Sequence, residues 1–293
     1  MGMTASARTE VLRYTAFTAD PGGGNPAGIV LDASALDEAA MLAIAADLGY
    51  SETAFLTGPP PGLGTEGRAF TARYFSPKAE VPFCGHATVA TAVALAERIG
   101  AGELVFATPA GTIPVDVVAD GSGTLRATLT SVEPSVAEVS EADLAEALAA
   151  LGWAADDLDP ALPPRVAYAG AHHLVLAAAS RARLADLDYD FGRLETLMRQ
   201  RDWTTLQLVW RSSAEVYHVR DPFPVGGVVE DPATGAAAAA FGAYLRELGL
   251  VPPATKITLH QGEDLGRPGE LGVELRADDP RIRVSGAAVR LTD

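Results

Sequence analysis

Two segments of the chain place a short polar loop directly before a helix of small apolar residues. In the first segment, Cys84, Gly85 and His86 lead into Ala87-Thr-Val-Ala-Thr-Ala-Val-Ala-Leu-Ala96. The first backbone N–H groups of a helix have no partner within the helix and lie at the positive end of its dipole. A helix that is apolar on every side is normally buried. Its N-terminus can therefore hold a carboxylate or a phosphate inside the protein.

The second segment repeats this arrangement about half a chain later. Glu230-Asp-Pro-Ala-Thr-Gly235 follows a strand-like stretch and precedes Ala236-Ala-Ala-Ala-Ala-Phe-Gly-Ala-Tyr-Leu245. A repeat at this distance is typical of an internal duplication. The sequence therefore predicts two related halves, each of which supplies one buried helix N-terminus.

Glu52 is a candidate base for such a site. It stands alone among small and apolar neighbours in a strand predicted at residues 51–56. On an edge strand it would be an ordinary surface residue. If it faces a pocket, burial raises its pKa toward neutrality because the ionised carboxylate is disfavoured there. In that case Glu52 could accept and donate a proton near neutral pH.

Short strands surround these features. The glycine-rich loop at residues 21–28, which contains Asn25, leads into a strand and so does not match a dinucleotide-binding loop. It is either a hairpin or a loop that a ligand approaches closely. Helices are predicted at residues 38–48, capped by Ser34 or Asp37 and ended by Gly49, and at residues 141–151, capped by Ser140. Many strands around one central helix in each half predict a strongly curved sheet or barrel.

Composition limits the classes of function. The chain has 293 residues, of which 48% are hydrophobic, as in soluble globular proteins. A net charge of −16 argues against nucleic acid and anionic membranes as partners. The sequence lacks an apolar run long enough to span a membrane and the apolar core of a signal peptide, so a cytoplasmic location is expected. One cysteine excludes an internal disulfide and a Cys-rich zinc site, and no metal site is predicted.

The chain also contains a set of motifs in a fixed order. They are Gly24-Asn-Pro-Ala-Gly28, Ser51-Glu-Thr-Ala-Phe55, Pro82-Phe-Cys-Gly-His-Ala-Thr88, Glu230-Asp-Pro-Ala-Thr-Gly235 and Gln261-Gly-Glu-Asp-Leu-Gly-Arg-Pro268. Together they resemble the phenazine-biosynthesis PhzF-like family. The resemblance implies an α+β fold of the diaminopimelate epimerase type, with two similar domains, each a curved β-sheet or barrel wrapped around a central α-helix. The active site then lies in the cleft between the domains.

The domain limits follow from composition and from this resemblance. A shift toward proline and acidic residues at positions 131–140 predicts a boundary there. The first domain is then residues 1–130 and the second is residues 131–279. In the family the final strand often returns to the first domain, which would concern residues 280–293 here.

The resemblance also implies roles for individual residues. Glu52 corresponds to the catalytic acid/base of the family, and His86 and Asp231 correspond to its polar partners in the cleft. The positions that would contact the substrate are Asn25, Gly85, Thr234, Gly235 and Ala236. The implied enzyme is an isomerase that moves a proton on a small cyclic or amino carboxylate without a cofactor, as a homodimer. A protonatable His86 and two helix N-termini would supply positive potential where negative charge develops.

Two departures from related proteins leave alternatives open. Racemases of this fold with two thiols carry a cysteine at each helix, whereas the second loop here carries Asp231 and the chain has no second cysteine. A dithiol epimerase is therefore excluded. An epimerase or racemase using Cys84 with Asp231 stays open as an alternative, and the preferred interpretation of Cys84 is a small buried side chain. Ala236 stands where the phenazine enzyme has serine. This predicts a different substrate, and a carboxylate-binding protein without turnover is a further alternative.

Overall fold

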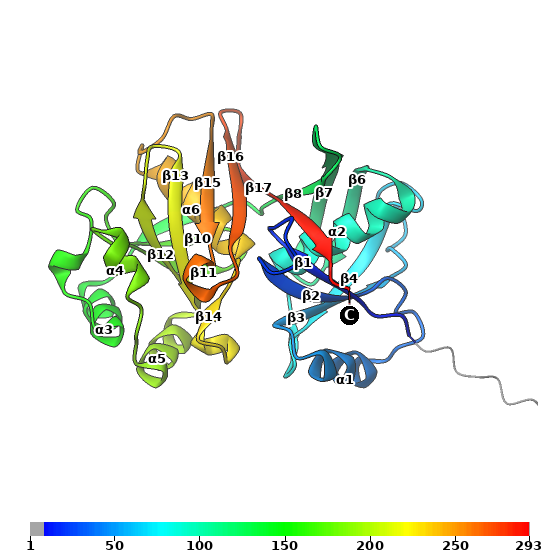
Figure 1. Cartoon of the computed structure of the whole chain (residues 1–293), viewed down its shortest axis with the longest axis horizontal. Coiled ribbons are helices and arrows are strands. Elements are labelled where there is room, and N and C mark those ends of the chain that lie inside the picture. Colours follow the sequence, from blue (N-terminus) through cyan, green and yellow to red (C-terminus); the bar gives the residue numbers. More distant parts are fainter. Residues whose placement is uncertain (1–8, 293) are drawn as a thin grey trace, which may run out of the picture.

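The computed structural model describes residues 9–292, which form two lobes side by side (Figure 1). Each lobe is a curved sheet around one central helix, α2 (Gly85–Ile99) in the first lobe and α6 (Gly235–Glu247) in the second. Every residue of α2 from Gly85 to Ala96 is buried. The small side chains of both helices allow strands to approach from all sides, as the sequence predicted.

The first sheet closes on itself. Its strands pair in the ring β1–β2–β3–β4–β6–β7–β8–β17, and β17 pairs again with β1. The pairs β2–β3 and β4–β6 are parallel, with α1 and α2 in the respective connections, and the others are antiparallel. A closed ring has no free edge. The elements of this lobe are β1 (Leu12–Ala16), β2 (Asn25–Val30), α1 (Glu38–Leu48), β3 (Glu52–Thr57), β4 (Ala69–Phe75), β5 (Glu80–Val81), β6 (Gly102–Thr108), β7 (Gly111–Ala119) and β8 (Leu125–Thr130).

The second sheet repeats the pattern of the first. Its strands pair in the order β9–β10–β11–β12–β13–β15–β16–β17, and β11–β12 and β13–β15 are the parallel pairs. Here α6 lies in the β13–β15 connection, as α2 does between β4 and β6. The elements are β9 (Ser135–Glu138), α3 (Glu141–Leu151), β10 (Arg165–Tyr168), β11 (His172–Ala177), α4 (Arg181–Ala185), α5 (Phe191–Arg201), β12 (Trp203–Arg211), β13 (Val216–Pro222), β14 (Glu230–Asp231), β15 (Thr255–Gln261) and β16 (Gly269–Arg276).

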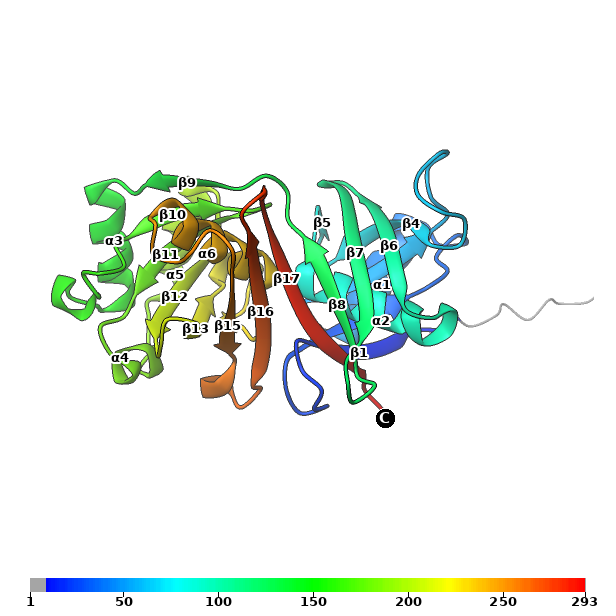
Figure 2. The same cartoon turned by 90° about the horizontal axis from the view of Figure 1, so that it is seen from above.

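The last strand, β17 (Asp279–Arg290), belongs to both sheets, and Figure 2 shows it between the lobes. Residues 283–285 pair with β16 on one side, residues 283–287 pair with β8, and residues 288–290 pair with β1. One strand thus ends the second sheet and closes the first ring. The predicted boundary after residue 130 falls at the end of β8.

Local capping sets the ends of the outer helices. The Asp37 side chain accepts a hydrogen bond from the N–H of Ala40 at the start of α1, and Ser140 does the same with Asp143 at α3. Gly49 and Gly152 follow these helices in the left-handed conformation that glycine favours. Both helices agree with the sequence prediction. The segment predicted as a boundary, however, contains β9, which pairs with β10.

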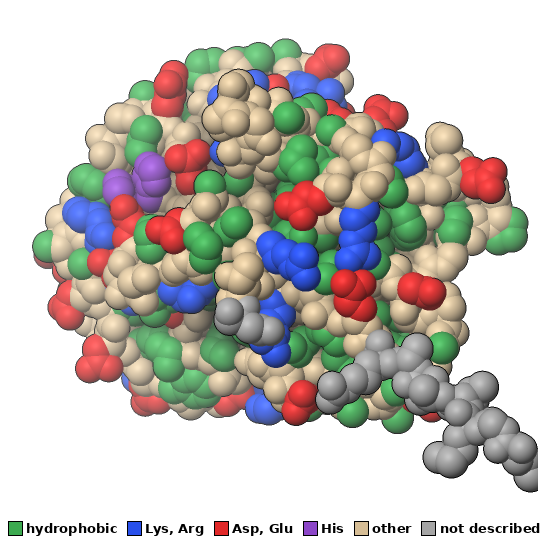
Figure 3. All heavy atoms as spheres, turned by 45° about the vertical axis from the view of Figure 1, so that its right-hand side comes forward, with side chains coloured by type: hydrophobic (Ala, Val, Ile, Leu, Met, Phe, Trp, Pro, Cys, Tyr) green, Lys and Arg blue, Asp and Glu red, His purple; other side chains and the backbone are tan. Residues whose placement is uncertain are grey.

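No helix in the described part of the chain is long and apolar enough to cross a membrane. On the face shown in Figure 3, Asp and Glu side chains lie among Lys and Arg side chains. The acidic residues on this face are therefore dispersed and do not form one patch.

Candidate active site

Both central helices begin after equivalent short hairpins. β5 pairs with the end of β4, β14 pairs with the end of β13, and in each case a proline follows before the helix. The N-cap residues are Cys84 for α2 and Thr234 for α6, and neither side chain caps its helix. The first N–H groups of both helices therefore lack the usual side-chain acceptor at the N-cap.

Glycines allow the two helix starts to meet. A Cβ on Gly85 would lie 3.3 Å from Cα of Gly235, and a Cβ on Gly235 would lie 3.2 Å from the ring of Phe17. Two positive dipole ends thus lie next to each other between the lobes. This contact explains why glycine is the first residue of each helix.

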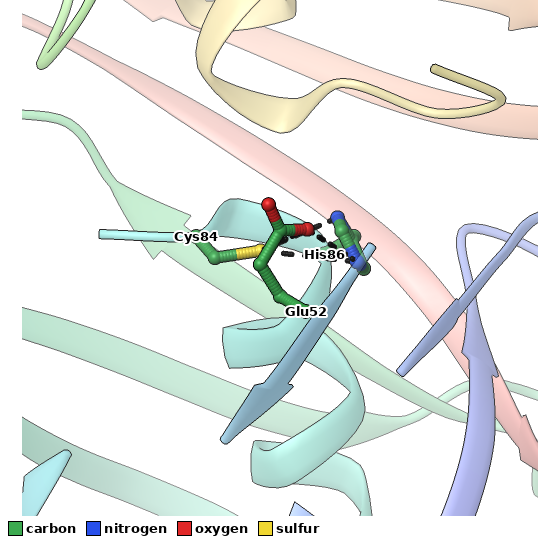
Figure 4. Close-up of side chains that lie close together, drawn as sticks. All are labelled: Glu52, Cys84 and His86. Carbon is green, nitrogen blue, oxygen red and sulfur yellow. Dashed lines mark hydrogen bonds and ion pairs between the residues drawn. The ribbon is translucent and has the colours of Figure 1, made fainter. Parts of the chain in front are cut away.

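Glu52, Cys84 and His86 form a compact group at the start of α2 (Figure 4). The Cys84 thiol donates to Oε2 of Glu52 at 3.6 Å, and Sγ lies 3.3 Å from Nδ1 of His86. Nε2 of His86 lies 3.5 Å from the same Glu52 oxygen. The exposed fractions of the three residues are 8%, 7% and 4%. Glu52 therefore faces the interior, which decides between the two positions that the sequence allowed.

Asn25 connects this group to the second lobe. Its amide nitrogen donates to Oδ1 of Asp231 at 2.7 Å and lies 3.1 Å from Nδ1 of His86. The same amide nitrogen also donates to the backbone carbonyl of Ala233 at 3.1 Å. Since an amide nitrogen can only donate, its contact with Nδ1 favours the tautomer of His86 that carries its proton on Nε2. That nitrogen faces Glu52 and the Ser51 hydroxyl, which is 3.3 Å away. The Thr234 hydroxyl donates to Oδ2 of Asp231 at 2.7 Å.

Burial determines the protonation states at this centre. Burial raises the pKa of Glu52, and the pKa of Asp231 rises to about 7 through burial and then through the charge of Glu52. Burial lowers the pKa of His86 to about 3, so its imidazole is neutral near pH 7. This argues against the expected contribution of a protonatable His86 to the positive potential at the site. Burial and then the charge of Glu52 raise the pKa of the Cys84 thiol well above its ordinary value.

The structure brings the predicted residues together at one place. Glu52, His86 and Asp231 lie around Asn25, and Gly85, Gly235 and Thr234 lie at the adjoining helix starts. Ala236, the second residue of α6, corresponds to His86 when the two hairpins are aligned on their prolines. It lines a small apolar cavity with Phe83 and Ile113. At equivalent positions, the first half therefore carries an imidazole and the second half carries a methyl group.

Two further residues at this centre were not predicted from the sequence. Ser51 contacts His86, and the Gln261 amide donates to the backbone carbonyl of Asp231 at 2.8 Å. The Gln261 side-chain oxygen accepts from the N–H of Thr234 at 2.9 Å. Each lies in a motif visible in the sequence, but only the three-dimensional contacts indicate its role.

One ligand atom from each of Glu52, Cys84 and His86 lies within 4.8 Å of the others. These side-chain types suit zinc when the thiol is ionised. In this structure the three groups contact one another directly, and the protonated Cys84 thiol donates to Glu52, so their arrangement is explained without a metal.

Two lobes, each a curved sheet around a central helix, with the two helix starts meeting between them, are the architecture of the diaminopimelate epimerase-like fold. A probable proline racemase from Agrobacterium radiobacter has the same fold, with a TM-score of 0.65 at 12% identity, covering 96% of this chain and 90% of the other. A PhzF-family protein from Bacillus anthracis is more similar, with a TM-score of 0.84 at 27% identity and 96% coverage of each chain. The predicted fold class is confirmed.

The particular family follows from the sequence comparison. The family model described as phenazine biosynthesis-like protein matches residues 14–293, so the chain belongs to this family. A Deinococcus radiodurans protein named as an uncharacterized isomerase is 34% identical, covering 96% of this chain and 92% of the relative. The trans-2,3-dihydro-3-hydroxyanthranilate isomerase of Pseudomonas chlororaphis is 31% identical, covering 94% of each. The predicted family is confirmed, and the chain is an enzyme of the isomerase class.

Proposed function

We propose that this enzyme is a cofactor-independent isomerase that moves a proton on a small cyclic or amino carboxylate, with Glu52 as the general acid/base. The observation that supports the proposal is the position of Glu52. Its buried carboxylate, with a raised pKa, lies beside two helix starts that have no side-chain cap. A carboxylate with a raised pKa is a stronger base than an exposed one, and such a group can carry a proton between two carbons.

In the proposed reaction the substrate carboxylate binds the N–H groups at the start of α2 and α6. Ionised Glu52 takes a proton from a neighbouring carbon, and the electron pair of that C–H bond shifts into the conjugated system. The helix N-termini stabilise the negative charge that develops there. Protonated Glu52 then donates the proton to a second carbon on the same face, so that the double bond has moved and no electrons are lost.

His86 and Asp231 act as partners of Glu52 in this proposal. Neutral His86 directs its Nε2–H toward Glu52 and can donate a hydrogen bond to the ionised carboxylate. Asp231, with a pKa of about 7, is hydrogen-bonded to Asn25 and Thr234 on the side of the second helix. We also propose that the enzyme is a homodimer, which sedimentation velocity would test. We further propose that it works in the cytoplasm.

The test is proton exchange with solvent. The protein is incubated in D2O with trans-2,3-dihydro-3-hydroxyanthranilate and with a panel of amino acids and 2-aminobenzoate-type acids, and NMR detects deuterium bound to carbon. Glu52→Gln should slow exchange by about 10²- to 10⁴-fold, the usual contribution of a general acid/base. Glu247→Gln, at the exposed end of α6, is the matched control.

The possible outcomes separate the alternatives. An unchanged exchange rate in Glu52→Gln would refute the role of Glu52. An acid that raises the melting temperature of the wild type but never acquires deuterium would favour a binding protein.

A further inference from the structure

Arg220 and Glu230 form a two-point ion pair next to Asp231. Nε of Arg220 donates to Oε1 of Glu230 at 3.0 Å, and Nη2 donates to Oε2 at 2.6 Å. Nη1 donates to the backbone carbonyl of Ala185 at 2.7 Å. The side chains of Arg220 and Glu230 are only 9% and 1% exposed. The guanidinium is therefore held from two sides in a fixed geometry.

Strand pairing connects this ion pair to the active site. β13 and β14 are antiparallel, with Pro222 opposite Glu230 and Asp221 opposite Asp231. Successive side chains of a strand point in opposite directions. Glu230 is accordingly bound to Arg220, while Asp231 is bound to Asn25. A displacement of the Glu230 side chain would thus displace the strand that presents Asp231.

The first lobe contains a similar two-point ion pair, between Arg73 and Glu80. Nε of Arg73 donates to Oε1 of Glu80 at 2.7 Å, and Nη2 donates to Oε2 at 2.6 Å. In both lobes the glutamate is the first residue of the short strand before the central helix. The residue after Glu80 is Val81, whereas the residue after Glu230 is the acid Asp231. The first pair therefore serves as a comparison within the chain. It has the same two-point geometry, but its side chains are 29% and 28% exposed and Arg73 also donates to Glu38 at 2.9 Å.

We propose that the Arg220–Glu230 pair is a positioning element for Asp231, which fixes the strand that presents this carboxylate and neutralises the charge of Glu230 beside it. Other groups also face Asp231. Glu52 on β3 acts on it through its charge, Asp221 lies opposite it on β13, and neutral His86 on α2 reaches it through Asn25. The charge of Glu230 is among the causes that raise the pKa of Asp231.

The experiment measures the titration of Asp231 directly. The full chain is labelled with ¹³C at the aspartate carboxyl carbons, and the Asp231 signal is assigned by its loss in Asp231→Asn. Arg220→Met leaves the charge of Glu230 without its partner and should raise the titration midpoint of Asp231. Glu230→Gln removes that charge and should lower the midpoint, in each case by about one pH unit. A purely structural role would not predict shifts of opposite sign.

The controls are Arg73→Met and Glu80→Gln, which should leave the Asp231 midpoint unchanged. If Arg220→Met does not fold, Arg220→Met/Glu230→Leu replaces it, because buried ion pairs can be exchanged for apolar side chains with little loss of stability. The double variant should also lower the midpoint, since the charge of Glu230 is absent. Unmoved midpoints in folded variants, or equal shifts in the Arg73 and Glu80 controls, would overturn the proposal. The signal does not depend on turnover, so failure here is distinct from failure of the proposed function.

Discussion

Asp231→Asn should stabilise the protein more at alkaline pH than at acidic pH. The pKa of Asp231 is raised from 3.8 to about 7 in the folded protein. Between these values the unfolded chain has already lost the proton while the folded protein retains it. The stabilisation that comes from holding this proton is fully present below the pKa of the unfolded chain. It is lost as the pH rises through the pKa of Asp231 in the folded protein. Asparagine cannot ionise, so the variant lacks this loss.

The magnitude follows from the shift. A rise from 3.8 to about 7 is 3.2 units, which corresponds to about 4 kcal/mol of unfolding free energy. About 3 kcal/mol of this is lost between pH 5 and pH 8.5. Asparagine can still accept from Asn25, but it loses the carboxylate oxygen that accepts from Thr234, at a cost of about 1 kcal/mol at every pH. The pH-dependent part can therefore be separated from the constant part.

The assay is urea unfolding followed by circular dichroism at pH 5, 6, 7 and 8.5. The free energy of unfolding of Asp231→Asn, relative to the wild type, should increase by about 3 kcal/mol from the lowest to the highest pH. Asp188→Asn, at an exposed aspartate, is the control for a change of one carboxylate. A difference that stays constant across this range would show that burial does not hold the proton on Asp231.

Two further substitutions test other parts of the structure. Cys84→Ala should keep the exchange rate within about tenfold of the wild type, because the thiol is protonated and only supports Glu52 with a weak hydrogen bond; a loss comparable to that of Glu52→Gln would favour an epimerase that uses Cys84 with Asp231. Gly23→Ala should destabilise the protein by about 1–3 kcal/mol in urea unfolding, because its Cβ would lie 2.3 Å from the carbonyl oxygen of Pro268. Unchanged stability in this variant would show that the glycine loop can move away from Pro268.

The sequence allowed prediction of those parts of the fold that local chemistry specifies. The two loop–helix segments predicted the duplicated halves, and the caps at Asp37 and Ser140 place α1 and α3. β9 was not predicted, because its four residues become a strand only through pairing with β10. β5 and β14, of two residues each, are likewise defined by their hairpin partners.

The same distinction applies to the candidate site. Residue types and motifs indicated Glu52, His86 and Asp231, but their protonation depends on burial, which a sequence does not show. His86 illustrates this, since its surroundings lower its pKa to about 3 and leave the imidazole neutral. Gln261 and Arg220 act through contacts with residues far away in the chain or on another strand. No local pattern marks such contacts.

The shared strand has a consequence for the order of folding during synthesis. The first barrel is built from β1 to β8, but its ring is closed by β17, which is translated after strands β9 to β16 of the second lobe. Until then β1 and β8 present unpaired edges, and such edges invite pairing with other chains. The first lobe therefore emerges from the ribosome as an open sheet before its barrel can close. A nascent chain stalled before β17 should thus be prone to aggregate, although most residues of the first barrel are already present.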